Sequence, residues 1–162
     1  MKQTHLTGMI MILFFSMTTT ATAVDISALD RVSVMMPKEK VLSILGPPGE
    51  TGKLSMGLTA EIYKVTGAPG SDAESMLGAG CVYDTNLVLK GLAFMFDGRV
   101  ARKSAEHMKA IGFTLIEEKE QSFRLTGKDD DTGLPIVVDI FEQEGMTTIM
   151  TLEKGFYEQM VK

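Results

Sequence analysis

A cysteine and a histidine are the residues of this sequence whose chemistry suits nucleophilic catalysis. Cys81 is the only cysteine in the 162 residues, and His107 is one of two histidines. A thiol hydrolase needs its thiol within hydrogen-bond reach of an imidazole base. Cys81 stands among small and apolar residues, which is typical of a buried and inert thiol. The sequence therefore predicts no catalytic residue, and a Cys-dependent hydrolase is the third of three functional hypotheses.

The candidate metal ligands are too few or wrongly spaced for a metal site. The run Asp129-Asp130-Asp131 lacks the alternation of a calcium-binding loop, so its carboxylates should point in different directions. One His and one Cys after residue 23 are too few for a zinc site. The methionines after residue 23 are scattered along the chain, which favours core packing over copper binding. We expect neither a metal nor another cofactor.

A glycine-rich segment, Gly46 to Leu54, superficially resembles a nucleotide-binding loop. That loop needs a glycine, four residues, and then Gly-Lys followed by Ser or Thr. Counting back from Gly52 reaches Pro47, and Leu54 stands where the hydroxyl should be. We therefore interpret the segment as the end of a helix followed by a loop.

The first residues indicate export. An apolar run within residues 8–15 and the ending Ala21-Thr22-Ala23 predict a signal peptide over residues 1–23, cleaved near Ala23. No Cys follows the run to carry a lipid anchor, and no second apolar stretch is long enough for a transmembrane segment. The chain has 16 Lys and Arg against 21 Asp and Glu, a net charge of -5, which argues against nucleic acid as a partner. We expect a periplasmic or secreted protein.

Hydrophobic periodicity and turn residues predict an alternation of short helices and strands. A helix from Pro37 to Leu45 should end at Gly46, and a second, capped by Ser104, should end at Gly112. The expected strands are 61–65, 81–83, 87–96, 99–103, 113–117, 121–126, 136–141 and 146–153, with a terminal helical turn at 156–161. The strand 87–96 is apolar on both faces and should be central in its sheet.

This order predicts an α+β fold in which short helices pack on one face of a small antiparallel sheet. The two halves look like loosely related helix-plus-strands units, 24–103 and 104–162, that share one core. The loop between 49 and 58 carries Leu54, Met56 and Leu58 between glycines. Exposed apolar side chains often mark partner sites, so these three residues are the predicted protein-binding site.

Residues 31–48 carry a recognisable pattern. Met36, Val41, Leu45, Gly46 and Pro48 match the sequence "G-M-S/T-x-x-x-V-x-x-x-L-G-x-P". On these residues the chain resembles the SmpA/OmlA/BamE-like family of small envelope proteins. Met35 stands where family members often have Gly, and Pro37 where Ser or Thr would cap the helix.

The resemblance implies a β-lactamase-inhibitor-like fold and a domain that acts by binding proteins, for instance in outer-membrane protein assembly. The leading hypothesis is therefore a non-catalytic periplasmic module with an envelope protein as its partner. The second is an inhibitor or a carrier of a small ligand or lipid, whose sheet face forms a pocket.

Overall fold

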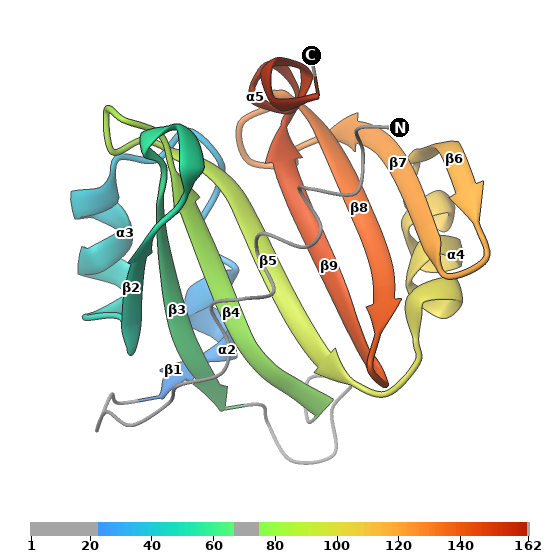
Figure 1. Cartoon of the computed structure of the whole chain (residues 1–162), viewed down its shortest axis with the longest axis horizontal. Coiled ribbons are helices and arrows are strands. Elements are labelled where there is room, and N and C mark those ends of the chain that lie inside the picture. The colour runs from blue at the N-terminus through green and yellow to red at the C-terminus, as the bar shows by residue number, and fades with distance from the viewer. Residues whose placement is uncertain (1–22, 67–74, 162) are drawn as a thin grey trace.

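The computed structural model describes residues 23–66 and 75–161. Most of the expected signal peptide lies outside these ranges, as do residues 67–74, which fall between the strands expected at 61–65 and 81–83. Nine strands in the described ranges form one sheet in the order β1-β3-β4-β5-β9-β8-β7-β6, with β2 also paired to β3 (Figure 1). The β1–β3 pair is parallel and the other pairs are antiparallel. No helix in the described ranges is long and apolar enough to cross a membrane.

The strands are β1 (Val24–Asp25), β2 (Glu50–Lys53), β3 (Thr59–Thr66), β4 (Met76–Tyr83), β5 (Leu89–Asp97), β6 (Thr114–Lys119), β7 (Ser122–Lys128), β8 (Pro135–Gln143) and β9 (Met146–Glu153). The helices are α2 (Ile26–Leu29), α3 (Lys38–Leu45), α4 (Ala101–Ala110) and α5 (Lys154–Met160), with a 3-10 turn η2 (Ser55–Gly57).

The expected fold class, short helices on a small antiparallel sheet, is wrong. The sheet is large and mixed, and it outweighs four short helices. One cause is β4, whose first half, through Gly78 and Gly80, reads as a loop because glycine is depleted in strands. A Cβ on Gly78 would lie 3.1 Å from the carbonyl oxygen of Tyr63, so close packing favours glycine there.

The strand expected at 99–103 is also wrong, because residues 101–103 belong to a helix. Asp97-Gly98 resembles a hairpin turn, but α4 begins at Ala101, and β5 pairs instead with β9, with Phe94 opposite Ile149. A pairing between residues distant in sequence therefore overrides the local turn signal. The expected boundary between residues 103 and 104 lies inside α4.

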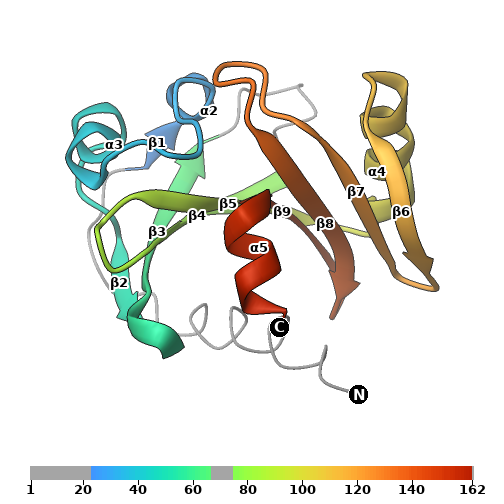
Figure 2. The ribbon, with the colours of Figure 1, turned by 90° about the horizontal axis from the view of Figure 1, so that it is seen from above.

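The register places alternate residues on two faces of the sheet. One continuous row, facing α2, α3 and α4, is Glu61, Cys81, Leu92, Thr151, Val138 and Leu125. The neighbouring row faces the other way and includes Val82 and Leu152, which pack with Phe156 of α5. Figure 2 shows α5 on the opposite side of the sheet from α2 and α3.

Both halves of the sheet follow the same plan. Helix α3 is followed by β2, β3, β4 and β5, and helix α4 is followed by β6, β7, β8 and β9. The last strands of the two halves, β5 and β9, pair with each other, so the pairing β2-β3-β4-β5 in one half mirrors β6-β7-β8-β9 in the other, and β1 is an addition beside β3. As expected from its apolar faces, β5 is central, because it lies between β4 and β9.

Candidate functional site

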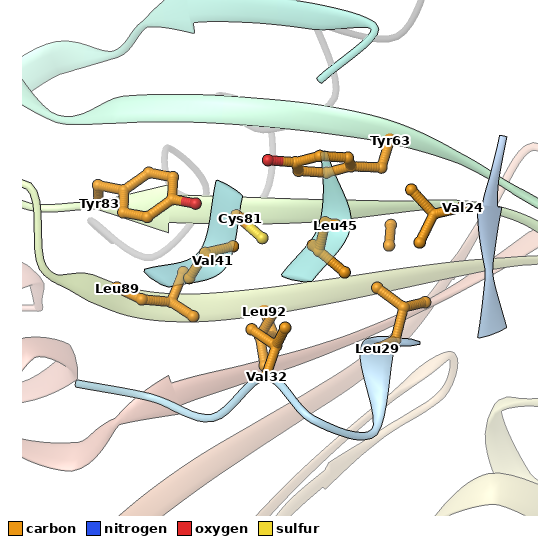
Figure 3. Packing of buried hydrophobic residues seen from close by; sticks show 11 residues of the cluster. Val24, Leu29, Val32, Val41, Leu45, Tyr63, Cys81, Tyr83, Leu89 and Leu92 are labelled. Atoms are coloured by element: carbon orange, nitrogen blue, oxygen red, sulfur yellow. The ribbon is translucent and has the colours of Figure 1, made fainter. Parts of the chain in front are cut away.

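The predicted nucleophile lies in the core beneath α3. Cys81 is fully buried in a cluster that includes Val41 and Leu45 of α3. The hydroxyl groups of Tyr63 and Tyr83 point toward each other beside the Cys81 side chain (Figure 3). Burial raises the pKa of Cys81 to about 12 and also raises the pKa of both tyrosines. The thiol is therefore protonated and shielded at neutral pH.

The predicted base lies elsewhere. His107 is exposed on α4, which packs on the other half of the sheet against β7 and β8. Cys81 belongs to the cluster between α3 and the first half of the sheet. The structure thus does not bring the two side chains together, and no hydrolytic step can be built on them as a pair.

We expect the Cys81 thiol to resist alkylation in the native state. Iodoacetamide at pH 8 should modify it only in the rare molecules that have opened, because the nucleophile is the thiolate and the sulfur has no access to solvent in the folded state. Mass spectrometry with and without urea measures the difference. Rapid native modification would show that the sulfur reaches solvent, and the burial beneath α3 would be refuted.

An ion pair lies beside the buried cluster. Glu61 is 1% exposed, and its carboxylate accepts a hydrogen bond from the Tyr63 hydroxyl at 2.9 Å. The Lys38 Nζ, at the first residue of α3, lies 2.5 Å from the other carboxylate oxygen and 5.6 Å from the centre of the Tyr83 ring. A buried carboxylate needs such partners, so these contacts join α3 to the sheet.

The acidic loop separates its carboxylates. Asp129 accepts hydrogen bonds from the amide and the hydroxyl of Thr132, which stabilises a local turn. Asp131 accepts a hydrogen bond from the Ser33 hydroxyl, 3.0 Å away. Nowhere in 23–66 and 75–161 do three or more His, Cys, Asp or Glu side chains gather as a metal site.

The glycine-rich segment after α3 begins with a helix end, as expected, but it continues as a strand and not as the expected loop. Gly46 has a φ of +76° and closes α3, and β2 follows from Glu50. Lys53 donates a hydrogen bond to the Thr59 hydroxyl at 2.9 Å. A phosphate loop requires a helix N-terminus after the glycines, and here a strand follows.

The three residues of the predicted binding loop have different environments. Met56 is 66% exposed, whereas Leu58 is 5% exposed and belongs to the core cluster with Val82 and Phe156. Leu54 is partly buried against the same cluster. Only Met56 is therefore free to contact a partner with most of its side chain.

Two further exposed apolar residues lie on segments beside this loop. Met35 is 42% exposed and Leu87 is 46% exposed. The Met35 amide donates to the Leu89 carbonyl at 2.7 Å, so the segments of Met35 and Leu87 run side by side. The turn after β4 reaches the η2 loop, because a Cβ on Gly57 would lie 3.0 Å from Thr85 Cγ2. We call Met35, Met56 and Leu87 the apolar tip.

The tip residues share an unusual backbone. Their φ angles are +71° at Met35, +61° at Met56 and +59° at Leu87. Side chains with a Cβ avoid this left-handed region, which costs roughly 1–2 kcal/mol per residue. Glu144, in the β8–β9 turn, is the one other non-glycine residue in the described ranges with a positive φ. Sequence reasoning missed Met35 and Leu87 because glycine or asparagine is the usual signal for such a position.

Replacing Met56 with Asn should therefore stabilise the protein. Asn tolerates the left-handed conformation, so the free energy of unfolding should rise by up to about 1 kcal/mol. Urea unfolding measures the change. The matched control is Leu77→Asn, which replaces another exposed apolar residue, but on β4, and should give no gain. Equal effects of the two substitutions would contradict the strain at Met56.

Comparisons of the chain with protein-family models, with curated proteins and with solved structures found no significant match.

Proposed function

We propose that this chain is a non-catalytic, protein-binding module of the bacterial cell envelope, exported to the periplasm, and that it binds its partner through the apolar tip. The observation that carries the proposal is the tip itself. Three large apolar side chains, 42% to 66% exposed, stand on left-handed backbone, where glycine or asparagine would cost less. Strain of this kind clusters at binding sites, where the side chain is needed despite its conformation.

The family pattern gives this argument a second support. Its glycine falls at Met35, where the φ of +71° suits glycine without strain. This chain keeps the conformation but has a methionine there, which adds an exposed apolar side chain. The resemblance at residues 31–48 also supplies the class of partner, a protein of the cell envelope.

Cross-linking in the native envelope tests the proposal. A photo-reactive amino acid at position 35 should capture a specific protein, identified by mass spectrometry. Met56→Asp and Leu87→Asp should each lower the yield by about tenfold, the loss expected when an apolar anchor at an interface is replaced. All three positions are exposed, so the folded state should persist.

The matched control is Ile116→Asp, an exposed apolar residue on β6 at the far edge of the sheet. It should leave the yield unchanged. Leu58→Asp is unsuitable, because a buried charge at that core position should unfold the chain. Capture that is equally strong with and without the two tip substitutions would remove the tip from the proposal.

A further inference from the structure

We infer that the tip docks into an uncharged, apolar pocket on a second protein, an inference that rests on the proposed function. The charges around the tip carry it. Each tip residue has a lysine three positions away in the sequence, Lys38 after Met35, Lys53 before Met56 and Lys90 after Leu87. Three lysines beside an exposed surface would normally favour an anionic partner.

All three lysines instead contact groups of this chain. Lys38 is paired with the buried Glu61 at 2.5 Å, and Lys53 donates to the Thr59 hydroxyl at 2.9 Å. The Lys90 Nζ lies 3.9 Å from an Asp84 carboxylate oxygen and 3.7 Å from one of Glu153. Lys38 and Lys90 thus have carboxylate partners within this chain that offset their charges, whereas the exposed Lys53 has only a neutral hydroxyl as its partner.

The Lys90 contacts also fix the shape of the tip. Its Nζ lies 2.9 Å from the Met35 sulfur, which holds that side chain in place. Asp84 accepts hydrogen bonds from the amides of Asn86 and Val88, on either side of Leu87. Lys90 and Asp84 therefore position Met35 and Leu87. The apolar side chains themselves stay exposed and can contact a partner.

The size of the tip determines the shape of the partner site. A standard protein interface buries about 800 Å² on each partner. Three partly exposed side chains that met a flat surface would bury less area than this. Protruding apolar side chains gain most when a pocket encloses them, as anchor residues do.

The test uses the full chain with the photo-reactive amino acid at position 35, in envelope extract. Met56→Lys and Met56→Glu should both lower the cross-linking yield at least tenfold, because an apolar pocket excludes either charge. Raising NaCl from about 50 to about 500 mM should change the yield of the chain that keeps Met56 less than twofold, since screening acts only on charges. Circular dichroism should show every variant folded.

The outcomes separate the two proposals. Opposite effects of Lys and Glu at position 56, or a tenfold loss of yield in high salt, would mean a charged partner site and would overturn this inference alone. Flotation of the purified chain with phosphatidylcholine or phosphatidylcholine–phosphatidylglycerol vesicles would identify a lipid surface and overturn it as well. The absence of any protein adduct from the folded chain would instead refute the proposed function.

Discussion

Replacing Lys38 with Met should lower the free energy of unfolding at pH 7 by on the order of 3 kcal/mol, the loss typical of a buried carboxylate that loses its cation. Glu61 is buried on the sheet face beneath α3, and Lys38 is its only ion-pair partner among the described residues. The Tyr63 hydroxyl would remain as a hydrogen-bond donor, but it supplies no charge. Urea unfolding followed by circular dichroism measures the loss.

Two controls distinguish a lost ion pair from a damaged helix. Lys40→Met changes an exposed lysine of the same helix and should alter stability by less than about 0.5 kcal/mol. The triple variant K38M/E61M/Y63F replaces the polar partners together and should recover most of the loss, because the buried carboxylate is removed with its cation and its hydroxyl donor. If the single and triple variants lose the same stability, packing rather than charge accounts for the effect of Lys38.

The elements that sequence patterns identified correctly are those defined by local signals. Gly46 ends α3 and Gly112 follows α4, both with positive φ. The strands expected at 136–141 and 146–153 are also present, as β8 and β9, and Glu144 and Gly145 form the turn between them. The apolar faces of residues 87–96 predicted a central strand, and β5 is central. In each case the residue itself restricts the backbone or requires burial on both sides.

The predictions that failed concern features that depend on contacts between distant segments. The alternation at Glu61-Ile62-Tyr63 correctly indicated a strand, but Glu61 and Tyr63 face the helices and Ile62 is buried on the other face. The pattern alone gave no reason to bury a glutamate. Its cation, Lys38, is 23 residues away in the sequence and comes close only when α3 packs on the sheet.

The candidate site was predictable in part for the same reason. Met56 was found because it lies in a glycine-flanked apolar loop, but Leu58 has the same local setting and is in the core. Met35 and Leu87 give no local signal, because their left-handed backbone follows from the pairing of residues 35–38 with 87–89. Strain imposed by tertiary contacts is invisible in composition and spacing.

The protein should also lose stability as the pH rises above 9, because the buried cluster around Cys81 holds its protons. The pKa of Cys81 is about 12 in the folded chain, against an ordinary value of 9.0. Between these values the folded state keeps a proton that the unfolded state has released, so alkali favours unfolding. From pH 8 to pH 10.5 this group alone should remove about 2 kcal/mol of stability.

The variant Cys81→Ala isolates this contribution. Tyr63 and Tyr83 also have raised pKa values, so the variant should still lose stability in alkali, but by about 2 kcal/mol less than the parent over the same range. Comparing the two pH profiles cancels any constant cost of the substitution itself. Parallel profiles would mean that the thiol titrates alike in both states, which is incompatible with a sulfur sealed between α3 and the sheet.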